Sequence, residues 1–282
     1  MEAVRQTLPL SCNSRISKIC DCVEQALILE ASAHPKPGLV TKLCNGSHSD
    51  MNFSTFLESA KAISTVFRKE LSTVLDLVLL DRDDLAIEAL RGVGRKAEFA
   101  MYRSTNGVNT HKGAIFLMLT VIYGIFWGAQ SYHEAVNNAK KYCYTLTRVD
   151  GSEKTTGARA YAQGIRGIRG VVQDGFPSII QFQPRLITER KTLGEEFAII
   201  NNLLGHMSVT EDTTLLNRHF DPAVITHVQN KAQAVINSGG ILSVLGSDLI
   251  SSLNDDLVDK LISPGGSADL TAVSLFLVYY YK

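Results

Sequence analysis

The chain has 282 residues, of which 45% are apolar and 20% are charged. This composition is typical of globular proteins, and it excludes disordered and fibrous classes. The 28 basic residues balance the 28 acidic ones, so no net field attracts the protein to nucleic acid or to an anionic membrane. We expect neither as a partner, and binding of an anionic ligand must depend on a local cluster of charges.

The cysteines predict a reduced, cytoplasmic protein. They are odd in number and form no paired CxxC arrangement, which favours free thiols over a disulfide or zinc framework; they are Cys12, Cys20, Cys22, Cys44 and Cys143. The first twenty residues contain no continuous apolar segment of the kind that forms a secretory signal.

Most of the chain carries apolar residues at helical spacing, whereas alternating strand patterns are scarce. One stripe runs from Ile16 to Leu27, and another begins behind Asn52 or Ser54 as the N-cap. Further helices are predicted at 71–80, 83–102, 113–129, 132–147, 192–204, 221–238 and 269–281. Only short pieces such as 178–182 could be extended. The sequence predicts one compact, multi-helix, all-α domain over residues 1–282.

The predicted helix at 113–129 is uncharged over seventeen residues, which is the lower limit for a membrane span. Its flanking residues His111 and Lys112 belong to a polar motif, and no other segment is a plausible second span. A fully buried core helix is therefore favoured over a transmembrane segment.

Five polar loops that contain glycine interrupt the helices, at 34–52, 103–113, 151–177, 205–220 and 263–270. Loops held by a rigid scaffold are where proteins usually place binding residues. We expect the five loops to form one composite site.

The first loop begins with a stiff proline segment. Pro35 and Pro37 prevent a helix through Lys36, and Gly38 permits a ligand to approach the backbone closely. Lys36 would suit a phosphate oxygen, although it could equally be a surface lysine.

The same loop ends with His48, Asp50 and Asn52, which alternate so that extended backbone would place them on one side. Asp50 could hold a divalent cation while His48 transfers a proton. Alternatively, Asp50 and Asn52 could simply cap the next helix.

The second loop places Asn106, Asn109, His111 and Lys112 directly before the most apolar helix. The first amide groups of that helix could receive an anion, with Lys112 adding charge. The glycine spacing of a Walker motif is absent, and His111 could also be a cap or a core histidine.

The remaining loops contain further charged groups. Arg166 and Arg169 lie among glycines and could clamp a polyphosphate by bidentate contacts. Asp212 and Asp269 come from separate loops and could share a divalent metal, although helix capping would explain each one singly.

Taken in order, these segments resemble the triphosphoribosyl-dephospho-CoA synthase family. The resemblance runs from about Glu30 to the last helix. It is carried by PKPGLV at 35–40, GSHSDM at 46–51, TNGVNTHKGAIF at 105–116, RGVVQDGFP at 169–177, DT at 212–213 with Arg218, and SPGGSADL at 263–270.

The resemblance implies an all-α enzyme that joins the triphosphoribosyl part of ATP to the ribose 2′-hydroxyl of 3′-dephospho-CoA and releases adenine. The product is the prosthetic-group precursor for the acyl carrier subunit of citrate lyase or malonate decarboxylase. Such a reaction needs a donor near the base, an acceptor for the hydroxyl proton and an anionic partner for the sugar. Mg²⁺ is the implied cofactor.

The resemblance also implies roles for individual residues. The expected catalytic residues are Asp50, His48, Glu30 and His111. The expected metal ligands are Asp50, Asp212 and Asp269. The expected substrate-binding residues are Lys36, Gly38, Asn106, Asn109, Lys112, Arg166, Arg169 and Arg218. The many apolar helices make a homodimer a reasonable expectation.

The chain departs from the family's usual pattern at several positions. Val171 stands where an acid commonly follows the glycine-rich arginine, Thr41 replaces an aspartate, and Thr214 replaces an asparagine. His219 and Phe220 stand where glycines are expected. Two alternatives therefore stay open: a degraded homologue that binds nucleotides or CoA derivatives as a regulator, and a Mg²⁺-dependent nucleotide N-glycosidase or phosphohydrolase on the same scaffold.

Overall fold

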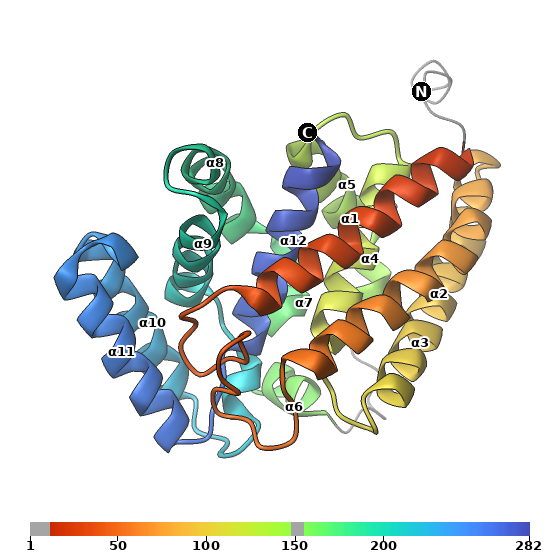
Figure 1. The fold of residues 1–282 in the computed structure, drawn as a ribbon. Helices are drawn as coiled ribbons and strands as arrows, with labels where there is room; N and C mark the ends of the chain where they lie inside the picture. The colour runs from red at the N-terminus through yellow and green to blue at the C-terminus, as the bar shows by residue number, and fades with distance from the viewer. Residues whose placement is uncertain (1–11, 148–154) are drawn as a thin grey trace.

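The computed structural model describes residues 12–147 and 155–282, which fold into helices without any strand (Figure 1). The all-α prediction is confirmed. The helices before residue 148 are α1 (Cys12–Ser32), α2 (Phe53–Leu79), α3 (Asp83–Ser104), α4 (Lys112–Phe126), α5 (Tyr132–Tyr142) and the 3₁₀ turn η2 (Tyr144–Thr147). Those after it are α6 (Thr156–Ala162), α7 (Gly167–Asp174), α8 (Pro177–Thr192), α9 (Glu195–Val209), η3 (Thr213–Leu216), α10 (Ala223–Asn237), η4 (Gly240–Leu242), α11 (Val244–Asp259) and α12 (Gly265–Tyr280).

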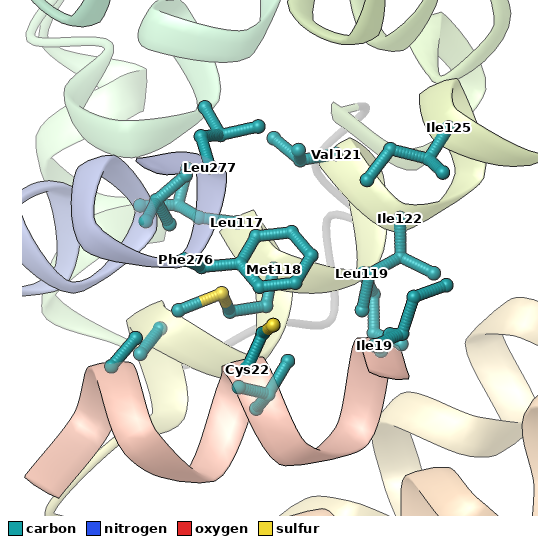
Figure 2. Packing of buried hydrophobic residues seen from close by; sticks show 14 of the residues in the cluster. Ile19, Cys22, Leu117, Met118, Leu119, Val121, Ile122, Ile125, Phe276 and Leu277 are labelled. Carbon is teal, nitrogen blue, oxygen red and sulfur yellow. The ribbon is translucent and has the colours of Figure 1, made fainter. Parts of the chain in front are cut away.

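Helix α4 crosses the larger of two hydrophobic cores. Every residue from Leu117 to Phe126 is buried, because α3, α5 and α12 pack against it. Figure 2 shows Cys22 of α1 facing Met118 of α4 and Phe276 of α12, with Ile19 of α1 beside Leu119 of α4. The buried-helix prediction for this segment is confirmed. Within residues 12–147 and 155–282, no helix has the length and apolar character needed to cross a membrane.

A smaller core joins α9, α10 and α11, which stand to one side in Figure 1. Leu203 of α9, Val228 of α10 and Leu253 of α11 are fully or almost fully buried there. Helix α9 also contributes Ile199 to the larger core, so it connects the two. Leu39 of the first loop packs into the smaller core, which holds that loop against α11.

Four helices escape the sequence patterns, namely α6, α7, α8 and α11. The segment 178–182, read as extended, lies inside α8, and α6 and α7 lie inside the predicted loop 151–177. Helix α7 ends at Gly175 in the left-handed conformation, and α8 restarts at once with Pro177 in its first turn. These helices are short or mostly polar, so their apolar periodicity is weak.

The cysteines are free, as predicted. Cys20, Cys22 and Cys143 are buried, and burial raises the pKa of the Cys20 thiol to about 12. A thiol of such a pKa is uncharged and unreactive at neutral pH, so these residues serve packing.

Candidate functional site

A cavity of about 480 Å³ lies where the loops between helices meet. The α1–α2 loop and α6, which border it, lie at the lower edge of the molecule in Figure 1. Each of the five predicted loops contributes to its wall, so the expectation of one composite site is confirmed. The charged and imidazole side chains that line it are Glu30, Lys36, His48, Glu98, His111, Lys112, Arg166, Arg169 and Asp269.

One wall of the cavity is apolar and partly aromatic. It is formed by the side chains of Leu39, Val40, Met51, Phe56, Tyr102, Phe116, Leu146, Ile168, Ala268 and Ala272. A largely apolar pocket with a few convergent polar groups is typical of small-molecule sites.

Lys36 and Glu30 form a buried ion pair in the cavity. The Lys36 Nζ donates to Glu30 Oε1 at 2.6 Å, and the two side chains are only 1% and 4% exposed. The last turn of α1 supplies the acid, and the proline segment supplies the lysine. A buried pair of this kind is costly to desolvate, so it is weak evidence for stability.

His111 is held rigidly at the start of α4. Its Nδ1 lies 2.7 Å from Ser59 Oγ, and Thr110 Oγ1 donates to the same serine oxygen at 2.7 Å. The Phe56 ring meets the imidazole edge to face at 4.9 Å. Burial, together with the Lys36 ammonium, lowers the pKa of His111 to about 3, so the ring is neutral at pH 7.

The Nε2 of His111 is buried, and it has no hydrogen-bond partner among residues 12–147 and 155–282. An unpaired polar atom in such a position is uncommon in folded proteins and points to a ligand or a water.

Asp269 lies near the start of α12, opposite the start of α4. Its carboxyl accepts the backbone N–H of Ala114. Burial raises its pKa well above the usual range, and the nearby carboxylates of Asp212 and Glu30 add to the effect. A Cβ on Gly113 would overlap Asp269 Oδ2, so only glycine at this position leaves room for the carboxyl group.

Asp212 is not among the lining residues, and both of its oxygens are engaged. Oδ2 accepts from the backbone and hydroxyl of Ser267, while Oδ1 accepts from Gly266 N and from the backbone and hydroxyl of Thr214. The carboxylate thus satisfies the free amides at the start of α12.

The remaining cations lie at the outer part of the cavity. Lys112 pairs with Glu98 at 3.0 Å, and Arg166 pairs with Asp174, with Nη1 and Oδ1 3.0 Å apart. Arg169 lines the same wall. The Asn109 side chain accepts the Lys112 N–H at 3.1 Å, which fixes the first turn of α4.

The structure does not bring every expected residue to the cavity. His48 lines it and lies 3.7 Å from Asp50, but the Asp50 side chain is 53% exposed and lies outside the lining. Burial lowers the pKa of His48. Asn52 caps α2 through a reciprocal pair of hydrogen bonds with Thr55, as the capping alternative predicted.

Three other expected residues also lie outside the lining. Gly38 has φ +70° and packs so closely against Leu257 and the Ile262 carbonyl that no Cβ fits. Asn106, also at positive φ, and Arg218 are exposed. Gly38 therefore serves close packing against the smaller core.

The substituted family positions have clear surroundings. Val171 packs against the larger core and does not line the cavity. The Thr41 hydroxyl accepts the N–H groups of Leu43 and Cys44, as an aspartate there could. Thr214 lines the cavity and donates to Asp212.

Sequence reasoning missed Ser59, Gly113 and Glu98. Ser59 and Glu98 lie within helical stripes, where nothing in the pattern distinguishes them. Gly113 directly follows Lys112 in a motif already singled out, and its position at a helix start could have indicated a close approach. Among the described residues, no group of three or more His, Cys, Asp or Glu side chains is placed to share a metal ion.

Comparison with known proteins identifies relatives that are all described as the same enzyme. Residues 16–282 match the family described as ATP:dephospho-CoA triphosphoribosyl transferase (CitG). The chain is 33% identical to a probable 2-(5''-triphosphoribosyl)-3'-dephosphocoenzyme-A synthase of Lactiplantibacillus plantarum, covering 90% of this chain and 93% of the relative. It is 34% identical to a protein of the same name from Stutzerimonas stutzeri, covering 94% and 92%. A synthase of Escherichia fergusonii is 29% identical, covering 94% and 91%. No solved structure matches the chain.

Proposed function

Because the chain belongs to the ATP:dephospho-CoA triphosphoribosyl transferase (CitG) family, we propose that it transfers the triphosphoribosyl group of ATP to the ribose 2′-hydroxyl of 3′-dephospho-CoA and releases adenine. The observation that carries the proposal is that family motifs from five separate loops line one cavity. In the reaction, the bond from C1′ to the adenine nitrogen breaks, and a bond from C1′ to the acceptor oxygen forms. The electron pair of the broken bond leaves with adenine, which takes up a proton and so balances the proton lost by the 2′-hydroxyl.

The cavity residues Glu30, Lys36 and Asp269 have the groups that this chemistry needs. Glu30 is our candidate for accepting the proton of the 2′-hydroxyl, and the adjacent Lys36 balances its charge in the protein. Asp269 lines the cavity, and the positive character that the sugar develops as adenine departs would favour the charged form of this carboxyl group despite its raised pKa.

The outer cations suit the triphosphate. Lys112, Arg166 and Arg169 come from two different segments of the cavity wall, so they could contact several phosphate oxygens at once. We place the triphosphate there, with the base and sugar further inside.

The acidic groups fit a bound Mg²⁺. This ion is usually held by one or two carboxylates together with substrate phosphates, so a large protein cluster is not required. Burial raises the pKa of Asp269, and the nearby carboxylates of Asp212 and Glu30 add to the effect, so a bound divalent cation would stabilise the charged form of this carboxyl group. Bound at Asp269, Mg²⁺ would neutralise charge on the triphosphate. Asp50 and Asp212 are poorer candidates, because one is exposed and the other is fully hydrogen bonded.

A second hollow suits the long arm of dephospho-CoA. Pockets for single ligands occupy about 300–1,000 Å³, whereas this cavity of about 480 Å³ must receive two nucleotides. A hollow of about 190 Å³ between α3 and α4 shares Glu98, Phe116 and Leu146 with the cavity. Leu90, Ile115 and Leu119 make it apolar, and we propose that the pantetheine arm lies there.

We further propose a cytoplasmic enzyme, in line with the free cysteines. Its product would supply the acyl carrier subunit of citrate lyase or malonate decarboxylase. A homodimer stays a prediction. The position of Val171 weakens the degraded-homologue alternative, because the valine replaces no carboxylate of the cavity wall.

The test is to incubate the purified protein with ATP, Mg²⁺ and dephospho-CoA, and to follow adenine and the CoA product by chromatography and mass. Adenine that appears only with dephospho-CoA supports the transferase. Adenine without the acceptor indicates an N-glycosidase, and nucleotide binding without turnover indicates a degraded homologue. Asp50→Asn, made in parallel, tests the role expected for that exposed residue.

A further inference from the structure

A chain of hydrogen bonds fixes the tautomer of His111. Thr110 Oγ1 donates to Ser59 Oγ at 2.7 Å, so the serine oxygen already accepts one hydrogen. A serine hydroxyl has a single hydrogen of its own, and the acceptor within reach of it is His111 Nδ1, at 2.7 Å. With no other acceptor recorded for the serine hydrogen among the described residues, the network favours Nδ1 as an acceptor. Because the ring is neutral, the hydrogen of the imidazole is on Nε2.

This Nε2–H is a donor that the protein leaves unpaired among its described residues. Nδ1 is directed at α2, and the two nitrogens of an imidazole point away from each other, so Nε2 is directed away from α2. His111 is 3% exposed and lines the cavity. A buried donor without a protein partner is costly, which points to an acceptor that a ligand supplies.

The surroundings of the ring suit a purine. Phe56 lies one turn before Ser59 on α2, so both face His111, and the capping box of Asn52 fixes where that helix begins. Met51, Tyr102 and Phe116 also line the cavity. Flat aromatic and apolar side chains are the usual contacts of a nucleobase.

Building on the proposed function, we propose that His111 Nε2–H donates a hydrogen bond to N3 or N7 of the adenine of ATP, and that Ser59 is the positioning residue that holds this tautomer. As the bond to C1′ breaks, electron density moves into the adenine ring. A fixed donor at a ring nitrogen is then bound more strongly in the transition state than in the ground state. The histidine stays neutral and transfers no proton.

The decisive experiment crosses two ATP analogues with His111 variants and measures adenine-base release in the presence of dephospho-CoA. In 3-deaza-ATP and 7-deaza-ATP, one ring nitrogen of the base is replaced by a C–H group. We expect one analogue to slow the wild type about 10- to 100-fold, and His111→Leu to slow release from ATP by a similar factor. The same analogue should slow His111→Leu no further.

His111→Gln serves as the conservative variant, because its amide nitrogen lies near the Nε2 position and can donate. It should keep at least ten times the rate of His111→Leu. If both analogues slow His111→Leu as much as they slow the wild type, the hydrogen bond does not exist. If the wild type releases no adenine from ATP, the proposed function itself fails, which is a separate outcome.

The role of Ser59 is tested by Ser59→Ala against Ser64→Ala. Both serines are buried on α2, but Ser64 bonds the Cys20 carbonyl instead of the histidine. In ¹⁵N NMR spectra, only Ser59→Ala should shift the His111 nitrogens away from the single Nε2–H tautomer. The kcat of Ser59→Ala should fall about 3- to 10-fold, while KM for dephospho-CoA stays unchanged. Ser59→Thr should restore both the tautomer and kcat. An unchanged tautomer in Ser59→Ala would overturn the assignment.

Discussion

Two regions of the molecule each bury one histidine in a similar environment. His206 lies where α8, α9 and α12 meet, and Ser178 and Ser274 lie within 3.0 and 3.1 Å of its two ring nitrogens. His111 lies at the cavity, where only Nδ1 has a partner among the described residues. Burial lowers the pKa of both to about 3. The two histidines thus have the same burial and the same lowered pKa. They differ in the number of hydrogen-bond partners within the described part of the chain: His206 has two and is structural, whereas His111 has one and keeps a ring nitrogen available for a ligand.

Two aspartates near the start of α12 repeat the contrast. Asp212 accepts five hydrogen bonds and lies behind the cavity wall, whereas the Asp269 carboxyl accepts the Ala114 N–H and lines the cavity. An acid whose oxygens are all engaged anchors the backbone. An acid with spare oxygens in a cavity can act on a ligand.

The largest expected effect separates these two aspartates. Asp269→Asn should lower turnover about 100- to 10,000-fold, because an amide cannot become negatively charged as positive character develops on the reacting sugar, yet it should not lower the melting temperature. Asp212→Asn should destabilise the fold by about 3 kcal/mol, because an amide nitrogen cannot accept from Ser267. Adenine release and thermal unfolding measure the two effects. If Asp212→Asn proves fully stable, the anchoring role is wrong.

The two histidines should separate in the same way. His206→Leu leaves the hydroxyls of Ser178 and Ser274 unpaired in the core, so it should lower stability by about 2 kcal/mol while the folded protein keeps its kcat. His111→Leu should lower kcat about 10- to 100-fold with a smaller loss of stability, since Nε2 has no described partner to lose. Denaturant unfolding and steady-state kinetics on both variants provide the comparison. Equal losses of kcat would remove the distinction.

The sequence predicts where the site lies better than it predicts which side chains of the site are available to a ligand. The five loops could be predicted because glycine, proline and charged residues cluster there, and all five contribute to the cavity. Which acid is available could not be predicted, because three of the hydrogen bonds that engage Asp212 come from Gly266 and Ser267, which are distant in the sequence. Ser59 was invisible for the same reason.

The helices likewise divide into those that the sequence predicts and those that it does not. Helices with strong apolar periodicity were predicted, and α4 was recognised as a buried helix from its uncharged run. Helices α7, α8 and α11 were missed or misread, since α7 is short, α8 is polar with Pro184 inside it, and α11 carries only a narrow stripe at Ile250, Leu253 and Leu257. Their stability comes from packing against neighbours, which a single-sequence pattern does not record.

Gly113→Ala tests whether the position of the Asp269 carboxyl group matters, and it changes no ionisable group. The added Cβ would overlap Asp269 Oδ2, so the carboxyl must move away from the start of α4. We expect kcat to fall about 10-fold or more. Gly92→Ala is a suitable control, because nothing lies within 4 Å of the position where its Cβ would be added. A fully active Gly113→Ala would show that the position of the carboxyl is unimportant.

The second hollow can be tested by filling it. Gly94 lines it, and Gly94→Leu should raise KM for dephospho-CoA about 10-fold while leaving KM for ATP unchanged. Gly92→Leu, two residues earlier on the same helix, is the matched control, and both changes favour helix formation. With ADP as a truncated acceptor, Gly94→Leu should behave like the wild type. An effect of equal size on both acceptors would exclude the hollow as the site of the pantetheine arm.

The last prediction concerns stability at acidic pH. The unfolded chain binds a proton at each histidine below pH 6.5, whereas folded His206 and His111 stay neutral to about pH 3. Stability should therefore fall as pH drops from 6.5 towards 3, by up to about 1.4 kcal/mol per pH unit for each histidine. Asp269 acts in the opposite sense, since its raised pKa adds stability at low pH that is lost as pH rises. Denaturant unfolding between pH 4.5 and 6.5 should show a slope in His206→Gln that is shallower by one proton. An unchanged slope would mean that folded His206 is protonated, which its two serine partners do not favour.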